Sequence, residues 1–189
     1  MVRVLLGSIV AAVVMFILGF VFYATPLAGI HVDSLDNAPA ATVQQTLAAN
    51  IPSTGTYSVP DPGTSEQTVM YGNGPIATIH YNSGGFATTN AGALVGGLVL
   101  DFFAALLIGA ALLGIDRRVP DFGSRAKLVV LFSAAASAYM HLIEPIMYHH
   151  DWGHFVYRFI ADFITLSAAG LVIARWFLPR IKAEPITTA

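Results

Sequence analysis

Four long apolar stretches restrict what this chain can fold into. Each is long enough to cross a hydrocarbon layer of about 30 Å as a helix that rises about 1.5 Å per residue. In chain order they are Val4 to Thr25, Ala91 to Ile115, Leu128 to Tyr148 and His154 to Leu178. The chain is 56% hydrophobic and only 11% charged, whereas a soluble domain carries about 25% charged residues. We therefore predict a membrane all-α fold with four transmembrane helices, a polar loop over Asp116 to Lys127 and a tight turn over His149 to Gly153.

Residues 27 to 90 differ sharply in composition, because they contain no Lys or Arg and are rich in small and polar residues. The pattern predicts a short helix over Pro39 to Asn50. It also predicts strands over Tyr57 to Val59 and Thr68 to Tyr71, the second forming a hairpin with Ile76 to Tyr81 through a glycine-rich turn. We expect a small α+β cap between the first two membrane helices, the alternative being a partly ordered loop.

The basic residues predict the orientation of the chain. With four spans, all of them except Arg158 fall on one side of the membrane: Arg3, Arg117, Arg118, Arg125, Lys127, Arg175, Arg180 and Lys182. The positive-inside rule then places both termini in the cytoplasm and the cap outside. The first apolar stretch exceeds the h-region of a signal peptide, about 7–15 residues, so we expect an uncleaved anchor.

These observations predict four segments in an inner (cytoplasmic) membrane, and the absence of cysteine is compatible with a bacterial envelope. The four segments are a transmembrane helix in 1–26, an extracytoplasmic, periplasmic cap in 27–90, a three-helix transmembrane region in 91–182 and a cytoplasmic tail in 183–189. The lipid bilayer is the first expected partner. A net charge of −2 gives no reason to expect nucleic acid. The chain contains no cysteine, which excludes disulfides, thiolate metal sites and cysteine nucleophiles.

A few ionisable side chains fall within the apolar stretches. They are Asp101, His141, Glu144, Arg158 and Asp162. His141 and Glu144 are three residues apart, and Arg158 and Asp162 are four apart, so each pair shares a helix face. Counting the helical rise from the outer ends brings all five to about the same layer of the membrane. Charged groups at this depth normally face a protein interior and pair with one another, so we predict an intramembrane polar cluster.

This cluster has several interpretations. In a structural one, Arg158 pairs with Asp162, Glu144 or Asp101, and His141 forms a hydrogen bond across the bundle. In a functional one, imidazole and carboxylate groups bind a metal such as zinc, copper or iron. The candidate ligands are His141, Glu144, His149, His150 and His154, with Asp162 as an addition. A proton relay through the same groups, and axial ligation of haem by His141, are further alternatives. No cofactor is required by the sequence.

Small residues recur at four-residue spacing in the first two apolar stretches. The pairs are Gly7 with Ala11, Gly92 with Gly96, Ala93 with Gly97, and Ala105 with Gly109. Such spacing allows helices to approach closely. It indicates either packing within this chain or a face for a partner helix. Ser8, Ser133 and Ser137 also lie in apolar stretches, and we interpret them as packing or back-bonding residues.

Several motifs together resemble a family of small bacterial four-span membrane proteins without assigned function. They are Arg3 before the first span, Pro52-xx-Gly55-x-Tyr57-xx-Pro60, the stretch from Gly74-Pro75 to Tyr81, and Asp162 in the last span. The resemblance covers most of the chain and implies four spans with an extracytoplasmic insert after the first helix. At the last turn, the family pattern has aromatic and amide residues where this chain has His149, His150 and His154.

Three functions follow as hypotheses. The first is a non-catalytic accessory or assembly subunit of a larger inner-membrane complex, respiratory or photosynthetic, with other membrane-protein subunits as partners. The second is a metal- or haem-binding membrane protein that uses the histidine and carboxylate cluster. The third is a small transporter or membrane enzyme. The sequence contains no P-loop, dinucleotide fingerprint, hydrolase elbow or HExxH motif, so a non-catalytic role is favoured.

Overall fold

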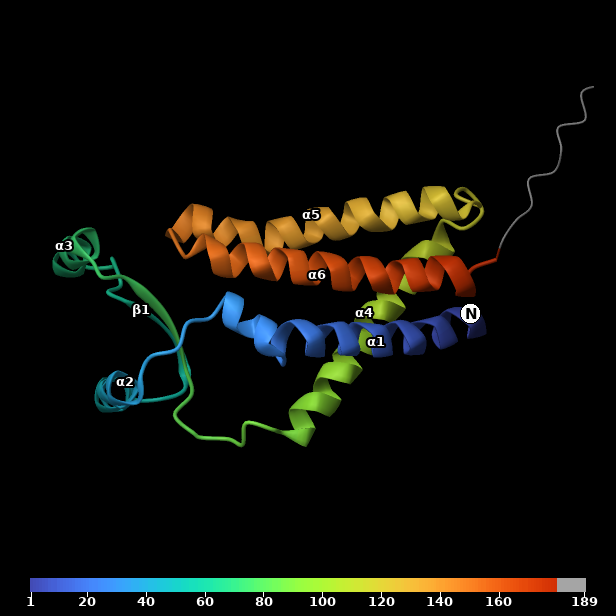
Figure 1. Cartoon of the computed structure of the whole chain (residues 1–189). Helices are drawn as coiled ribbons and strands as arrows, with labels where there is room; N and C mark the ends of the chain where they lie inside the picture. Colours follow the sequence, from blue (N-terminus) through green and yellow to red (C-terminus); the bar gives the residue numbers. More distant parts are fainter. Residues whose placement is uncertain (180–189) are drawn as a thin grey trace, which may run out of the picture. The chain divides into compact units, whose positions relative to one another are not determined.

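A computed structural model of the chain describes residues 1–179 and is mostly helical. Four of its helices are long and apolar enough to cross a membrane, which confirms the prediction of four apolar helices (Figure 1). They are α1 (Val2–Tyr23), α4 (Ala91–Gly114), α5 (Phe122–Tyr148) and α6 (Trp152–Val172), and the π-helical turn η2 (Ile173–Phe177) extends α6. Arg180, Lys182 and the predicted tail over 183–189 lie outside the described residues.

The chain divides into two compact units. The first contains Met1–Asp33 and the chain from Ala91 onward, and it includes the four long helices and a 3-10 turn, η1 (Pro26–Ile30). The second, Ser34–Asn90, contains all the remaining elements. These are α2 (Asn37–Asn50), β1 (Gly55–Val59), α3 (Ser65–Asn73) and β2 (Ala77–Tyr81). The predicted helix over Pro39 to Asn50 is therefore confirmed as α2.

The predicted hairpin is wrong in one of its strands. Residues 68–71 belong to the helix α3, and β2 pairs instead with β1, antiparallel, with Tyr57 opposite Ile79. The reason is local: the Thr64 hydroxyl accepts a hydrogen bond from the backbone N–H of Gln67, which caps the first turn of α3. Gly74, with a φ of 66°, ends the helix. A capped and terminated helix therefore outweighs the weak strand preference of this stretch.

Two helix starts also differ from the prediction, and aspartates explain both. The Asp121 carboxylate accepts a hydrogen bond from Ser124 N–H at 2.8 Å, so α5 begins at Phe122 and Arg125 lies on the helix rather than in a loop. Asp151 accepts from His154 N–H at 2.7 Å and caps α6. Backbone N–H donors of this kind hold the pKa of both carboxyls below its usual range. The turn between α5 and α6 is consequently shorter than predicted.

Close packing in the four-helix unit depends on a few glycines. A Cβ on Gly170 of α6 would lie 2.5 Å from Val129 Cγ1 of α5, and a Cβ on Gly109 of α4 would lie 2.7 Å from Val4 Cγ1 of α1. Gly7 would meet Phe177 in the same way. Gly7 of α1 and Gly109 of α4 are therefore packed within this chain.

Helix α4 differs from the other three long helices in its burial. Only 6% of its most apolar stretch is buried, compared with 22% to 33% for the others. Figure 1 shows α4 crossing α1, so the two helices are in contact over part of their length only. Ala105 and Gly109 are buried, whereas Gly96 and Gly97 have open space where a side chain would be. The first half of α4 therefore leaves its small-residue face uncovered within this unit.

Helix α5 buries one residue in every four along nearly its whole length. The buried positions are Arg125, Val129, Ser133, Ser137, His141 and Pro145. Residues four apart form one ridge on a helix, and such ridges are what neighbouring helices pack against. The ridge brings one cation, two hydroxyls and one imidazole into the interior, and it supplies most of the polar chemistry described below.

Candidate functional site

A short polar contact in the four-helix unit joins α5 to α6. His141 Nε2 lies 2.6 Å from Asp162 Oδ2, and the His141 side chain is 5% exposed while that of Asp162 is 32% exposed. The α5 ridge directs His141 inward, and Asp162 faces it from the antiparallel helix. A nitrogen–oxygen distance this short is typical of a charge-assisted hydrogen bond, so the pair links the two helices by more than apolar packing.

Tyr23, at the end of α1, extends this contact to a third helix. Its hydroxyl donates to the other carboxylate oxygen, Asp162 Oδ1, at 3.4 Å. Arg158, one turn before Asp162 on α6, interacts with the same hydroxyl. Tyr23 therefore lies between the cation and the carboxylate. The carboxyl group of Asp162 thus joins α1, α5 and α6. Arg158 contacts this group through Tyr23, a residue that the sequence pattern did not indicate.

A second cluster forms where the chain leaves α1. His31 Nδ1 lies 3.1 Å from His154 Nδ1, and His154 Nδ1 is also 3.0 Å from the carbonyl oxygen of His31. The His31 ring stacks on Tyr157 with a centroid distance of 4.3 Å. Tyr157 donates in turn to the carbonyl of Phe22 at 2.7 Å. These contacts fasten the segment after α1 to the start of α6.

Electrostatics within this second cluster favour an uncharged His31. Loss of solvent around the ring lowers its pKa, and the neighbouring charges of His154 and Arg158 lower it further. The geometry agrees, because a neutral His31 leaves Nδ1 free to accept a hydrogen bond from His154.

The five residues of the predicted polar cluster are divided in the structure. His141 and Asp162 are in direct contact, and Arg158 reaches them through Tyr23. Glu144 pairs instead with His150, whose Nδ1 lies 3.5 Å from the carboxylate. Asp101, on α4, has no hydrogen bond or ion pair with any other residue in 1–179.

The candidate metal ligands are divided in the same way. His141 contacts Asp162, Glu144 contacts His150, and His154 contacts His31. His149 is exposed at the turn, where it adopts a left-handed conformation with a φ of 55°. Within the described part of the chain, no three His, Asp or Glu side chains are gathered closely enough to hold one metal ion.

Comparison with known proteins identifies no relative. No protein-family model, curated protein or solved structure matches this chain. The family resemblance drawn from the motifs therefore stays a prediction, and any function must be argued from the residues themselves.

Arg125 is a buried cation that the sequence analysis counted only as a marker of orientation. It is 1% exposed and donates to three backbone carbonyls. Nε donates to Val119 at 2.7 Å, Nη1 to Pro179 at 3.0 Å and Nη2 to Asp116 at 3.3 Å. The guanidinium therefore joins the loop after α4 to the segment after η2. Arg125 lies four residues before Val129 and so belongs to the buried ridge of α5. This spacing is the sequence signal that could have predicted its burial.

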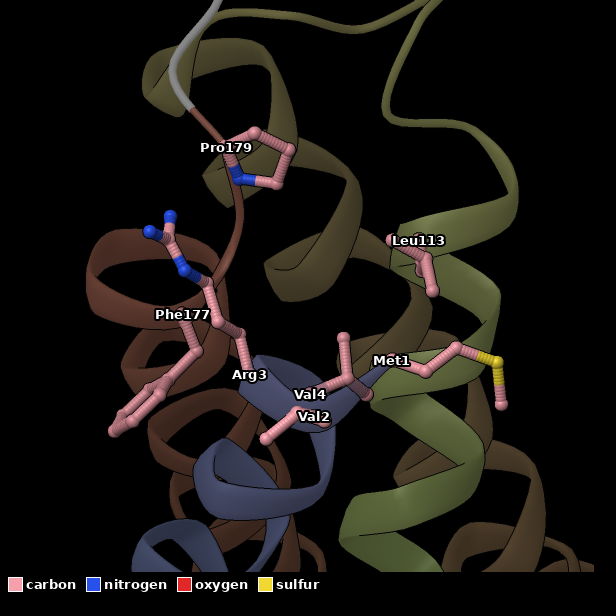
Figure 2. Close-up of a pocket in the computed structure, with 7 residues that line it drawn as sticks. All are labelled: Met1, Val2, Arg3, Val4, Leu113, Phe177 and Pro179. Atoms are coloured by element: carbon pink, nitrogen blue, oxygen red, sulfur yellow. The ribbon is translucent and has the colours of Figure 1, made fainter.

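Three cavities accompany these contacts. One of about 450 Å³ is an apolar groove between α4 and α5, and it includes Phe132 and Ser133. One of about 420 Å³ lies where α1 begins, beside Leu113, Phe177 and Pro179 (Figure 2). The third, of about 710 Å³, lies within the second unit between α2 and β2. Neither His141 nor Asp162 lines any of the three.

Proposed function

We propose that this protein is a non-catalytic accessory or assembly subunit of a larger complex in a bacterial inner membrane, respiratory or photosynthetic. In this proposal both termini are cytoplasmic, residues 34–90 are periplasmic, and the first half of α4 is the surface that contacts the partner. The observation that carries the proposal is Asp101, a carboxylate without a partner in 1–179 on the least buried of the four apolar helices.

Exposed apolar side chains alone do not require a protein partner, because lipid tails cover them equally well. A carboxylate is different. Asp101 lies ten residues after Ala91, which at about 1.5 Å per residue is about 15 Å along a span of about 30 Å. An acidic residue at that depth costs about 2.5–3.5 kcal/mol on insertion scales. A partner helix that supplies a basic or hydrogen-bonding side chain at the same level would remove most of that cost.

The surroundings of Asp101 suit such a partner. Gly97, Asp101, Ala105 and Gly109 are spaced by four residues and so share one face of α4. The second half of this face packs on α1, where a Cβ on Gly109 would meet Val4. The first half lies beyond the crossing and is open at Gly97. A partner helix on this face would approach closely and meet Asp101 directly.

The orientation is supported by the basic residues at the beginning of α1 and around the turn between α4 and α5, and by their absence from 34–90. Because the chain has no cysteine, single substitutions can report it. In sealed right-side-out vesicles, an impermeant maleimide should label Thr42→Cys, on the exposed face of α2, and should not label Arg117→Cys. Labelling of Arg117→Cys alone would overturn the orientation.

The proposed function is tested by purifying the tagged full-length chain from its native membrane in a mild detergent. A stable companion should co-purify with the wild type, and Gly97→Leu and Asp101→Leu should each release it. Ala135→Leu makes a matched change at an exposed position of α5 and should retain it. If the wild type runs alone at the size of a monomer or dimer, or if Ala135→Leu releases the companion equally, the proposal fails.

A further inference from the structure

The cavity at the start of α1 combines apolar walls with a cation. Met1–Val4 form one wall, Leu113 of α4 another, and Phe177 and Pro179 a third. Figure 2 shows that these side chains come from three separate segments, with the guanidinium of Arg3 near Pro179 in this view. Its volume of about 420 Å³ lies within the range of small-ligand pockets, about 300–1,000 Å³.

Arg3 is available for a ligand. It makes no hydrogen bond or ion pair with any residue in 1–179, and no acidic residue lines the cavity. Exposed cations follow in the turn after α4, at Arg117 and Arg118. The lining therefore favours an anion, and nothing within the lining neutralises Arg3.

The apolar walls decide which kind of anion fits. Arg3 stands at the beginning of an apolar helix long enough to cross a membrane, so the cavity opens at the level where the apolar span begins. Val2, Leu113 and Phe177 offer nothing to an inorganic ion, but they suit the first carbons of an acyl chain. Basic pockets between transmembrane helices on the cytoplasmic side bind anionic lipid headgroups.

We propose that this cavity binds an anionic phospholipid, with the headgroup phosphate at Arg3 and the upper part of one acyl chain against Val2, Leu113 and Phe177. The site is independent of the α4 surface assigned to a partner subunit, and a detergent-purified chain is sufficient to test it.

The test is native mass spectrometry of the full-length chain, delipidated in detergent and incubated with equal amounts of phosphatidylglycerol and phosphatidylcholine. The wild type should retain one phosphatidylglycerol at least fivefold more often than one phosphatidylcholine. Arg3→Gln should reduce this ratio to near one. Val2→Trp places a large side chain at an exposed position that lines the cavity and should reduce retention of the anionic lipid. Arg117→Gln removes the same charge outside the cavity and should leave the ratio unchanged.

Three results would overturn the proposal: equal retention of both lipids by the wild type, equal losses in Arg3→Gln and Arg117→Gln, or full displacement of the lipid by millimolar inorganic phosphate. The second result would mean diffuse attraction by the basic surface, and the third a site for a free anion. Unchanged melting temperatures in Arg3→Gln and Val2→Trp would show that the variants fold.

Discussion

Arg125 offers the sharpest test of the packing described here. The change Arg125→Met keeps an apolar side chain of similar reach and removes the guanidinium, so the carbonyls of Asp116, Val119 and Pro179 lose their donor. A hydrogen bond from a charged donor contributes about 1.5–3 kcal/mol. Removing a buried cation also relieves its desolvation cost, which offsets part of the loss. We expect the free energy of unfolding to fall by about 2–4 kcal/mol.

The geometry also predicts the result of a conservative change. The three carbonyls belong to two segments far apart in the sequence, and the flat guanidinium reaches them with three different nitrogens. The single ammonium nitrogen of Arg125→Lys cannot donate to all three carbonyls in these separate directions. Arg125→Lys should therefore lose more than half as much stability as Arg125→Met. Only Arg125→Met removes the positive charge and the orientation signal that this charge provides.

The assay is equilibrium unfolding of the purified chain in mixed detergent micelles, followed by the fluorescence of its two tryptophans, Trp152 in α6 and Trp176 in η2. Arg118→Met removes the same charge from an exposed position and should change the unfolding free energy by less than about 0.5 kcal/mol. The reasoning is refuted if the unfolding free energy of Arg125→Met lies within about 0.5 kcal/mol of the wild-type value. It is also refuted if Arg118→Met is equally destabilising.

Three further predictions concern the contacts between helices. Gly170→Leu should destabilise the chain by about 1–3 kcal/mol in the same unfolding assay, because a Cβ alone would lie 2.5 Å from a methyl carbon on α5. His141→Ala leaves the Asp162 carboxylate with only a long contact from α1; since Asp162 is partly exposed, we expect a loss of about 1–3 kcal/mol. The contact of His31 with His154 should weaken on acidification, because the pKa of His31 is lowered in the folded state. The contribution of this contact to the stability of the fold is complete above the ordinary histidine pKa and is lost as the pH falls below it. An NMR titration should show His31 gaining its proton below the ordinary value of about 6.5.

Matched controls keep these predictions distinct. Gly19→Leu adds the same side chain where nothing lies within 4 Å and should cost little, so equal losses at both glycines would contradict the packing argument. His149→Ala, at the exposed turn, should leave stability unchanged; if it matches His141→Ala, the imidazole–carboxylate contact is not the cause. Replacing His154 by Phe should return the titration of His31 towards its ordinary midpoint, and an unaltered midpoint would remove His154 as a cause.

The sequence predicted the elements whose signals are local and repeated. The long apolar runs identify α1, α4, α5 and α6, because an apolar run of that length has few other folds open to it. The short run at 68–71 was misread, since its cap at Thr64 and its end at Gly74 lie outside the apolar pattern. The starts of α5 and α6 were also mispredicted, because their capping residues, Asp121 and Asp151, lie outside the apolar pattern.

The candidate site was less predictable, because its contacts join residues far apart in the chain. Helical spacing places Arg158 and Asp162 on one face, but it gives no sign that Tyr23 of α1 lies between them. His31 stands in a polar segment after the first apolar run and has no local pattern that indicates His154, 123 residues later. Spacing along one helix therefore predicts which groups share a face, and only the packing of helices decides which groups meet.

The buried ridge of α5 has a consequence for how this protein tolerates changes in length. Each residue turns a helix by about 100°, so adding one residue between Val129 and His141 would rotate everything beyond it by that angle. His141 would then swing away from Asp162 while Val129 still faced Gly170. Adding four residues would restore the direction to within about 40° but shift the imidazole by about 6 Å along the axis. Substitutions can accumulate on the outer surface of this helix, whereas insertions and deletions in its middle cannot be absorbed.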